Sequence, residues 1–584
     1  MWQYRAPLRD LRYVIEELLE LPAQWAALPA FAELDAATAR QVLDEAARFA
    51  TEVIAPLNAS GDLEGCRWHD GAVTTPNGFP AAYRAFVAGG WPALSADPAE
   101  GGQGLPQVLD AALYEMLVGA NHAWTMYPGL LHGACECLRA HASPALKAAY
   151  LDKLVSGEWL STMCLTEAQA GSDLGLITTR AEPQADGSVR LRGTKIFISG
   201  GEHDLSDNIV HLVLARLLDA PAGSKGLTLF LCPKILPDGA RNAVRCDGIE
   251  KKMGIKASAT CVLGFDGAVA WPVGEANRGL AAMFVMMNSA RLHVALQGLG
   301  HAHAAHDNAL RYAAERVQSR APVRPEAARG PADPIVAHPA MRMVLLRQRV
   351  LVEGARVLTI EAAHRLDLAA HAPESAARAQ AEDELSLLTP VLKAFLTGQG
   401  FTIANDALQL HGGHGYVHDY GIEQCVRDSR IAMIYEGTNE IQAIDLVLRK
   451  LVADGGVRFA ALLGTLAAAL PAQGRLADEV RTRLAQLRAA AAELVEAAPA
   501  DAELPYRAAD AFLDATGWLL VAHAWARAQA LSSQPRHADD PWHAAKRASA
   551  RHCADHLLPE FDHALARVRA AWQALASIEP NPTP

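Results

Sequence analysis

Apolar and polar residues follow three different patterns along the chain. From about residue 40 to 160, apolar residues recur at spacings of three and four, as in TARQVLDEAARFATEVIAPLN at 38–58, which predicts amphipathic helices. Thr38 stands where the first helix should begin, and we predict it as the cap. The loop SADPAEGGQGLPQ interrupts the helices. We therefore predict an N-terminal extension at 1–39 and a helical domain at 40–160.

Around residue 161 the pattern changes to short β-branched and apolar runs separated by Gly, Asp and Pro. Such runs are typical of strands joined by turns. We predict a compact antiparallel β domain at 161–278, with strands in the segments 188–201, 209–218, 225–233 and 259–271.

The helical pattern returns near residue 279, at GLAAMFVMMNSARLHV, and lasts to about 452. One loop, SRAPVRPEAARGPADP, breaks it with four prolines. A further alanine- and leucine-rich helical segment occupies 453–584. The chain is thus predicted to be mostly α, with a central β domain and an appended C-terminal helical domain.

The composition limits the classes of function. The 584 residues are 51% hydrophobic and 20% charged, enough for a large core and several domains. The formal net charge of -12 argues against a nucleic-acid surface, because phosphate binding depends on clustered Lys and Arg. The N-terminus lacks the apolar core of a signal peptide, and no apolar run approaches the length of a membrane span. We expect a cytoplasmic protein with no membrane span and no nucleic-acid partner.

No metal ligation is expected from the sequence. The nine cysteines form no CxxC pair and no Cys/His zinc spacing. His411, His414 and His418 lie close together in the chain, but their spacing matches no ligand pattern on a defined helix. We interpret them as surface or capping histidines.

The stretch MCLTEAQAGSDLGLITTRAE, at 163–182, places small polar residues at the boundary between helices and strands. Thr166, Gly171, Ser172 and Asp173 form a loop whose backbone N–H groups could face a phosphate or a polar ring edge. A tight interdomain turn, in which the side chains bond to their own backbone, explains the same residues equally well.

Two glycine-bounded stretches leave room for a flat ligand. In KIFISGG an apolar strand ends so that a ring could lie against Phe197, while Ile198 and Ser199 offer backbone and hydroxyl groups. Gly412 and Gly413 in QLHGG remove side-chain bulk where another backbone or a cofactor comes close. A buried strand followed by a turn is the simpler interpretation of KIFISGG.

One acid, Glu436, lies in RIAMIYEGTNEIQ, just after an apolar run. Asn439 with Gln442 predicts a capping box, so Glu436 precedes the helix and is free to project into a cleft. The apolar approach predicts apolar surroundings, which raise the pKa of a carboxyl group toward the working pH. The alternative is a solvated loop glutamate.

In this order, LTEAQAGSD, FIS, NSAR, ER at 315–316, QLHGG and IYEGT resemble the motifs of the acyl-CoA dehydrogenase family over about residues 40–452. The segments APLRDLRYVIEEL, GPADPIVAHP and the C-terminal extension are similar to a long bacterial branch that includes the 3-methylmercaptopropionyl-CoA dehydrogenases. The resemblance implies an N-terminal helical domain, a middle antiparallel β-barrel at 161–278, a C-terminal four-helix bundle at 279–452, and the appended domain.

The resemblance also implies FAD as cofactor, an acyl-CoA substrate and specific site residues. The FAD contacts it implies are Leu165, Thr166, Gly171, Ser172, Phe197, Ile198, Ser199, Arg316, Gln409, Gly412, Gly413, Thr438 and Glu440. The substrate contacts it implies are Ser172, Asn288, Arg291, Tyr435 and Gly437. Because Arg316 and Gln409 to Gly413 would reach the FAD of a neighbouring subunit, a homodimer or homotetramer is expected.

Glu436 matches the catalytic base of the family, and the other base position used by some relatives is Ala290, which cannot take a proton. The expected reaction removes the α-proton and the β-hydride of an acyl-CoA and gives a trans-2-enoyl-CoA. In the family pattern, the backbone N–H of Glu436 and a flavin ribityl hydroxyl hold the thioester oxygen, and electrons pass to an electron-transfer flavoprotein.

Two other functions stay open. One is an acyl-CoA oxidase, which carries out the same half-reaction and passes electrons to oxygen. The other is a flavin-bearing relative that acts as a DNA-binding or scaffolding protein through its C-terminal extension. The balanced charge after residue 455 disfavours DNA binding.

The chain also departs from the family after the ER motif, where Ser319 and Arg320 replace the usual aromatic residue and glycine.

Overall fold

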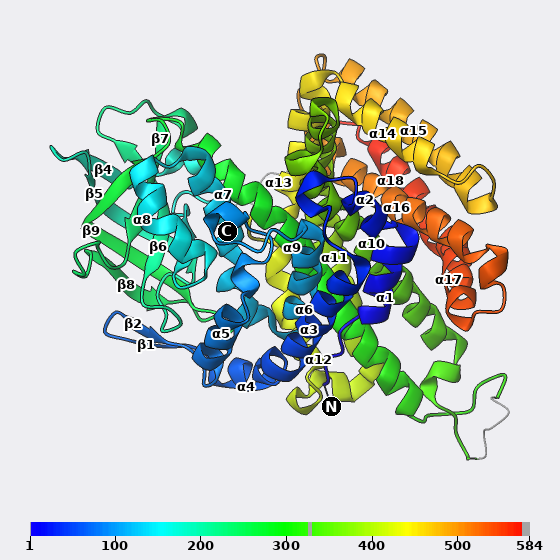
Figure 1. Cartoon of the computed structure of the whole chain (residues 1–584). Coiled ribbons are helices and arrows are strands. Elements are labelled where there is room, and N and C mark those ends of the chain that lie inside the picture. Colours follow the sequence, from blue (N-terminus) through cyan, green and yellow to red (C-terminus); the bar gives the residue numbers. More distant parts are fainter. Residues whose placement is uncertain (1, 325–329, 575–584) are drawn as a thin grey trace, which may run out of the picture.

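The computed structural model describes residues 2–324 and 330–574. Two lobes are visible in Figure 1: a β domain on the left and a larger helical body on the right. The N-terminal extension forms α1 (Leu8–Arg12), the turn η1 (Tyr13–Leu18) and α2 (Leu21–Trp25) on the helical body. The next helices are α3 (Ala36–Phe49), α4 (Leu57–Glu64), α5 (Phe79–Ala88), α6 (Gln107–Thr125), α7 (Leu131–His141) and α8 (Pro144–Val155), with a small hairpin of β1 (Arg67–His69) and β2 (Ala72–Thr74).

The predicted cap of the first long helix was wrong. The helix α3 begins at Ala36, and the side chain of Asp35 accepts a hydrogen bond from the backbone N–H of Thr38 at 2.7 Å. Asp35 is the better cap because its carboxylate satisfies an N–H group that has no partner within the helix.

The β domain is a barrel, as predicted. Its strands are β3 (Leu160–Cys164), β4 (Arg180–Pro183), β5 (Val189–Ser199), β6 (Ile209–Leu217), β7 (Leu227–Pro233), β8 (Val244–Ile249) and β9 (Thr260–Val273). The order β6-β4-β5-β9-β7 closes because β7 also pairs with β6, while β3 and β8 pair with the outer parts of β6 and β9. The prediction of a purely antiparallel barrel was wrong, because β3 and β4 both run parallel to β6.

The bundle is built from three long helices, α9 (Gly279–Glu315), α10 (Pro339–His371) and α11 (Ser375–His411). A fourth helical stretch begins with α13 (Asn439–Ile444) and continues through the turns η13 (Asp445–Leu451) and η14 (Val452–Asp454), after the short α12 (Ile422–Ser429). Two glycines bring α9 and α11 together: a Cβ on Gly298 would lie 2.4 Å from the carbonyl oxygen of Leu396, and one on Gly400 would lie 2.5 Å from that of Gly298.

In the described residues, α9 is long and apolar enough by composition to cross a membrane. Two thirds of its apolar window, 67%, is buried inside the protein, where it packs against α6, α10 and α11. Its apolar character therefore fits the centre of the helical body.

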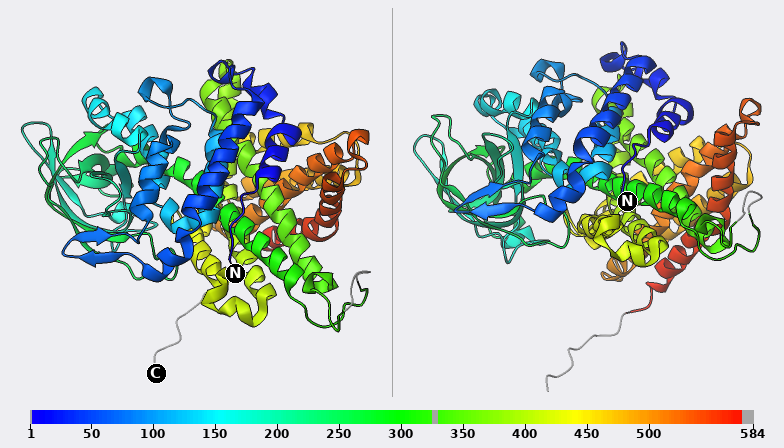
Figure 2. Two further views of the ribbon diagram at one scale, coloured as in Figure 1. Left: turned by 60° about the horizontal axis from the view of Figure 1, so that its bottom comes forward. Right: turned by 90° about the horizontal axis from the view of Figure 1, so that it is seen from below.

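The appended segment contains α14 (Val457–Ala469), α15 (Arg475–Ala497), α16 (Leu504–Ser532), α17 (Pro541–His552) and α18 (Leu558–Ala570). These helices lie against the bundle on the side away from the barrel, as the two turned views in Figure 2 show. The ring N–H of Trp525 on α16 donates a hydrogen bond to the carbonyl oxygen of Val350 on α10 at 2.9 Å. The last ten residues of the appended segment lie outside the described part of the chain.

Candidate active site

Glu436 lies on a left-handed turn between α12 and α13. Its φ is 56°, and the φ of the next residue, Gly437, is 81°. A left-handed conformation costs a residue with a side chain about 1–3 kcal/mol, so the surrounding structure must hold the turn in place. A residue larger than glycine does not fit at position 437, because a Cβ there would lie 2.7 Å from Nε2 of Gln442.

Two side chains hold this turn by its carbonyl groups. Nζ of Lys393, on α11, donates to the carbonyl oxygen of Gly437 at 2.8 Å and lies 3.1 Å from Oδ1 of Asn439. Nε2 of Gln442 donates to the carbonyl oxygen of Glu436 at 3.0 Å. The predicted capping box of Asn439 and Gln442 was therefore wrong: Thr438 caps α13 by accepting from the N–H of Ile441, and Gln442 is free to fasten the turn.

The surroundings of Glu436 shift the pKa of its carboxyl group. Burial raises its pKa to about 7, against the lowering effect of the Arg291 and Lys393 charges. Burial also lowers the pKa of Lys393 to about 7, and the negative charge of Glu436 opposes this shift. No described residue donates a hydrogen bond to the carboxylate of Glu436 or accepts one from its backbone N–H. Both groups are thus available to a ligand.

Arg291 brings a positive charge to the same turn from α9. Its side chain is buried, lies 3.9 Å from the carboxylate of Asp445, and donates to Oδ1 of Asn288 at 3.3 Å. Nη2 of Arg291 is also 3.9 Å from the Cβ position of Gly437. Asn288 is exposed one turn before Arg291, so the pair presents polar groups beside the Glu436 turn.

Behind Glu436, a buried polar network fixes Tyr435. Its hydroxyl lies 2.5 Å from Oε1 of Gln297 on α9 and 3.4 Å from Sδ of Met126. Nε2 of His122, on α6, is 3.3 Å from the same hydroxyl, and Gln297 in turn donates to the hydroxyl of Tyr114 at 3.2 Å. This network locks the residue that precedes Glu436 to two helices of the core.

On the β domain, a buried ion pair orders the loop that follows β3. Nζ of Lys195 on β5 lies 2.8 Å from Oε1 of Glu167 and donates to the carbonyl oxygen of Leu165 at 2.9 Å. Glu167 also accepts hydrogen bonds from the backbone and hydroxyl groups of Thr178 and Thr179. Burial raises the pKa of Glu167, but the Lys195 charge and these hydrogen bonds lower it to about 2. The carbonyl oxygen of Thr166 accepts from the N–H of Ile196 at 2.9 Å, so the start of the loop is hydrogen-bonded to β5.

Phe197 is the exposed aromatic residue at the end of β5. It has a left-handed φ of 59° and leaves 59% of its surface exposed. The pairing of β5 with β9 shifts register between Lys195 and Ile198, which places Phe197 on the bulge. Ile198 is 2% exposed and anchors the strand in the barrel, and Ser199 is half-buried beyond it. The end of the strand thus presents the Phe197 ring to the surface, so β5 is not buried along its whole length.

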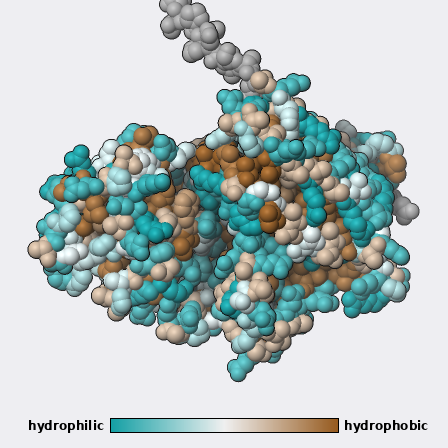
Figure 3. Space-filling model, turned by 90° about the horizontal axis from the view of Figure 1, so that it is seen from above, coloured by the Kyte–Doolittle hydropathy of each residue, from teal (hydrophilic) through white to brown (hydrophobic). Residues whose placement is uncertain are grey.

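Met126 and Tyr127, directly after α6, connect the end of β5 with the Glu436 turn. The hydroxyl of Tyr127 accepts a hydrogen bond from the N–H of Ala259 at 2.9 Å, and the carbonyl oxygen of Ala259 accepts one from Gly200 at 2.8 Å. The adjacent Met126 contacts Tyr435. The two motifs therefore meet the same short segment, at the boundary between barrel and bundle. In Figure 3 the surface is hollowed along this boundary, between the left lobe and the helical body.

The other predicted cofactor residues lie at exposed positions. Arg316 ends α9 and Gln409 to Gly413 end α11, and the two ends meet where the Tyr312 hydroxyl donates to the carbonyl oxygen of His411 at 3.2 Å. A Cβ on Gly171, Gly412 or Gly413 would meet no described atom within 4 Å. Ser172 and Glu440 are exposed as well. The Phe197 ring, the three glycines and the polar residues Ser172 and Glu440 are thus all accessible to a ligand. The described contacts do not connect all of them to one another.

Comparison with known proteins identifies the family of the chain. The chain matches "Acyl-CoA dehydrogenase, N-terminal domain" over 36–158, the "middle domain" over 162–268, the "C-terminal domain" over 277–451 and "Acetyl-CoA dehydrogenase C-terminal like" over 458–579. The chain belongs to the acyl-CoA dehydrogenase family, whose enzymes are oxidoreductases acting on the CH–CH bond of an acyl-CoA and whose cofactor is FAD.

One relative is the 3-methylmercaptopropionyl-CoA dehydrogenase of Ruegeria pomeroyi, 45% identical over 88% of this chain and 90% of that protein. Among solved structures, Caenorhabditis elegans ACDH-11 in complex with C11-CoA superimposes with a TM-score of 0.79 at 21% identity, covering 95% of this chain and 92% of that one. An acyl-CoA dehydrogenase complexed with FAD from Bacillus anthracis gives a TM-score of 0.74 at 19% identity, covering 98% and 93%. The fold, including the appended helices, is therefore shared.

Sequence reasoning missed several residues that build the site. Lys393 and Gln297 lie inside long helices, where nothing in the local pattern separates them from solvated or core positions. The apolar neighbours of Lys393 in TPVLKAFL are the one signal that the lysine is buried. Lys195 falls on the inward-facing positions of the alternating strand VRLRGTKI, so its burial could have been predicted from the period of two.

Proposed function

We propose that the protein is an FAD-dependent acyl-CoA dehydrogenase that converts an acyl-CoA to its trans-2-enoyl-CoA, with Glu436 as the catalytic base. The observation that carries the proposal is a carboxyl group with a pKa of about 7, held on a strained turn at the boundary of barrel and bundle. A base is most effective when its pKa lies near the working pH. Ala290, the other family position, has no proton-accepting group.

The α-hydrogen of a thioester is a weak acid, so its removal also needs stabilisation of charge on the carbonyl oxygen. In this proposal the backbone N–H of Glu436 donates to that oxygen; in its support, the N–H precedes α13 and has no acceptor among the described residues. Arg291 and Lys393 keep part of the Glu436 population ionised, since both charges lower its pKa. Bound FAD supplies the acceptor for the β-hydride.

The proposed contacts follow from the family pattern. Arg291, Asn288, Tyr435 and Gly437 would meet the acyl-CoA beside Glu436, with Ser172 on the β domain. The residues proposed to hold FAD are Leu165, Thr166, Gly171, Ser172, Phe197, Ile198, Ser199, Thr438 and Glu440 in one subunit and Arg316, Gln409, Gly412 and Gly413 of its neighbour. The open glycines support this division, because they leave room at the surface for a second chain and its cofactor.

The remaining parts of the proposal concern partners and substrate. An electron-transfer flavoprotein is the proposed acceptor, a homodimer or homotetramer the proposed assembly, and the cytoplasm the proposed location. The Ruegeria relative supports a short thioether acyl-CoA among the substrates. Flavin bleaching across a series of acyl-CoAs, including 3-methylthiopropanoyl-CoA and branched chains, tests the substrate, and peroxide formation against dye-linked turnover separates dehydrogenase from oxidase.

The test of the base is Glu436→Gln. The variant should retain its yellow flavin and bind acyl-CoA, yet fail to bleach when substrate is added, because an amide cannot accept the α-proton. Glu275→Gln is the matched control, since the Glu275 side chain is 78% exposed and should bleach like the unaltered protein. Bleaching of Glu436→Gln at the normal rate would contradict the assignment.

A further inference from the structure

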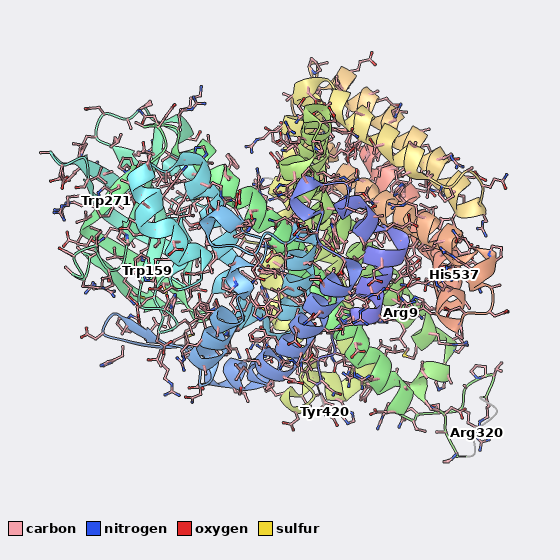
Figure 4. The ribbon with its side chains drawn as sticks, viewed as in Figure 1. Arg9, Trp159, Trp271, Arg320, Tyr420 and His537 are labelled. Carbon is pink, nitrogen blue, oxygen red and sulfur yellow. The ribbon has the colours of Figure 1, made fainter. Side chains whose placement is uncertain are left out.

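A second group of ligand-type side chains lies where the appended helices meet the N-terminal extension. His537 ends the turn η15 (Pro535–His537), Asp540 caps α17, and His543 lies in the first turn of that helix. One ligand atom from each of these three residues lies within 4.8 Å of the other two. Figure 4 shows His537 at the edge of the appended helices, on the side that carries Arg9 of α1. The cluster is thus separate from the Glu436 turn.

The orientation of His543 leaves one nitrogen for a ligand. Its Nδ1 lies 3.1 Å from the hydroxyl of Ser532, and the side chain is 1% exposed. Because Nδ1 is occupied, Nε2 is the atom that faces the cluster. Nε2 lies 4.0 Å from Oδ2 of Asp540, whose Oδ1 is already used to cap α17 through the N–H of Trp542 at 2.8 Å. His543 and Asp540 therefore each present one further ligand atom to the cluster.

Glu17 adds a fourth donor from the N-terminal extension. Its Oε2 lies 3.4 Å from Nε2 of His543, while its Oε1 is paired with Arg9 at 2.6 Å. The extension and the appended helices are more than 500 residues apart in the chain, so the cluster joins its two ends. Two imidazole nitrogens and two carboxylate oxygens make up the donor set.

The loop that carries the ligands is held rigidly. The guanidinium of Arg547 donates to the carbonyl oxygens of Ser532 at 2.5 Å, His537 at 3.1 Å and Ala538 at 3.0 Å. A fixed loop and a hydrogen-bonded histidine are what a metal site requires around its ligands.

We propose that His537, Asp540 and His543, together with Glu17, form a structural site for a divalent transition-metal ion of the Zn²⁺ class. Imidazole and carboxylate donors suit Zn²⁺ in tetrahedral coordination, whereas Mg²⁺ and Ca²⁺ prefer oxygen alone. Zn²⁺ bonds of about 2.0–2.2 Å place tetrahedral ligand atoms about 3.4 Å apart. The ligand atoms of His537, Asp540 and His543 lie within 4.8 Å of one another, so they must move inward to reach this spacing, and the His537 ring must turn, since it stacks on His543 with ring centroids 3.7 Å apart. Glu17 lies near His543 but outside this group of three, so its carboxylate must move as well.

The charges around the cluster favour a bound cation. Oε2 of Glu17 lies 3.4 Å and Oδ2 of Asp540 lies 4.0 Å from Nε2 of His543, so two carboxylates face this nitrogen. A metal ion satisfies both carboxylates and the nitrogen at once. In the sequence the three residues form the pattern HADDPWH, in which the two histidines and Asp540 recur every three residues.

The site would fasten the extension to the appended helices, because Glu17 lies on η1 and the other ligands on η15 and α17. A ligand that binds only the folded state raises the stability of that state. Zn²⁺ should therefore raise the melting temperature of the protein without altering acyl-CoA turnover.

The experiment uses the full-length, flavin-loaded protein after treatment with a chelator. Equilibrium dialysis should find one Zn²⁺ per chain, and Co²⁺ should give the visible absorption of a tetrahedral site. His537→Ala and Asp540→Asn should each weaken Zn²⁺ binding by at least about tenfold. Asparagine keeps the helix cap, so Asp540→Asn should stay folded. Glu17→Gln should weaken binding as well.

His556→Ala is the control, because His556 is an exposed histidine of the same region and belongs to no such cluster in the described chain. It should bind Zn²⁺ as the unaltered protein does and show the same rise in melting temperature. The absence of saturable Zn²⁺ binding would overturn the proposal. So would affinity that is unchanged in His537→Ala or Asp540→Asn, and unchanged affinity in Glu17→Gln would overturn the link to the extension.

Discussion

At the scale of single residues, the left-handed turn of Glu436 holds the backbone and the side chain in different ways. Its backbone is fixed by Lys393 and Gln442, while its carboxylate is left without a described hydrogen-bond donor. A carboxylate that is not stabilised by hydrogen bonds keeps its basicity, and burial raises its pKa further. The contacts that hold the backbone of the turn therefore leave the carboxyl group with its raised pKa.

The pH dependence of turnover should report the ionisation of Glu436. The pKa is raised from the usual range to about 7, so the group is protonated and inactive as a base below that pH and active above it. We expect kcat/KM for a good acyl-CoA substrate to rise with pH and to level off above about 7. Stopped-flow bleaching between pH 5 and 9 is the measurement, and a profile that is flat down to pH 5 would contradict the raised pKa.

Lys393 should act as a positioning residue, because it touches the carbonyl group of the turn and lowers the pKa of Glu436 through its charge. Lys393→Met should reduce the bleaching rate by about 10²-fold, as expected for a misplaced catalytic group, while flavin is retained. The acid limb of its pH profile should move to higher pH, since a neutral side chain no longer favours the ionised carboxylate.

Lys393→Arg is the matched comparison, because it keeps the charge and changes the geometry. Its acid limb should stay closer to that of the unaltered protein even where its rate falls. An unshifted limb in Lys393→Met would show that the charge of Lys393 does not act on Glu436.

At the scale of elements, the loop after β3 depends on the Glu167–Lys195 pair. Both side chains are almost wholly buried. Removal of one partner of a buried pair typically costs about 3–5 kcal/mol, because the other charge is left without compensation. Lys195→Met should therefore lower the free energy of unfolding by about that amount and release FAD more readily, since the loop carries Thr166 and Leu165.

Lys153→Met is the control for this variant. Lys153 pairs with Glu158 at 2.6 Å on the surface, where solvent screens the charges, so its loss should cost much less than the loss of the buried pair. Urea unfolding and the flavin released at a fixed temperature measure the two effects. Equal stability of the two variants would mean that the buried pair adds nothing to the loop.

The elements also show what the sequence can and cannot predict. The long strands β5, β6, β7 and β9 follow from their β-branched runs, and the bundle helices follow from their periodicity, because both patterns are local. The short β3, β4 and β8 were missed, since each becomes a strand by pairing with β6 or β9. The left-handed φ of Glu436 was missed for the same reason: Lys393, which fixes the turn, is far away in the chain.

At the scale of the whole molecule, one buried ionic network joins the extension, the N-terminal helices, the bundle and the appended helices. Asp10 on α1 pairs with both Arg356 on α10 and Lys546 on α17. Arg356 also binds Glu115 on α6 at 2.6 Å, and Lys546 lies 3.0 Å from Glu353 on α10. Each of Asp10, Arg356, Glu115 and Lys546 is less than 10% exposed.

The same network predicts a pH dependence of stability. Burial raises the pKa of Asp10, but Lys546 and Arg356 lower it to about 2. A carboxyl group with a lowered pKa stabilises the fold at every pH above its unfolded value, near 4, and this contribution is lost as pH falls from there toward 2. Melting temperatures measured between pH 6 and 3 should fall less steeply in Asp10→Asn than in the unaltered protein.

The network also makes the appended helices part of the cooperative fold. Lys546→Met leaves the Asp10 and Glu353 carboxylates with less positive charge in a buried place, so we expect a loss of about 3–5 kcal/mol in the free energy of unfolding. Because Asp10 and Arg356 belong to other parts of the chain, this loss should appear in the main unfolding transition and not in a separate early one. Arg567→Met on α18 is the control, since its pairs with Asp510 and Asp514 are exposed and should contribute about 1 kcal/mol or less. If Lys546→Met released the appended helices while flavin fluorescence and the remaining transition were unchanged, the appended helices would be an independently folding attachment.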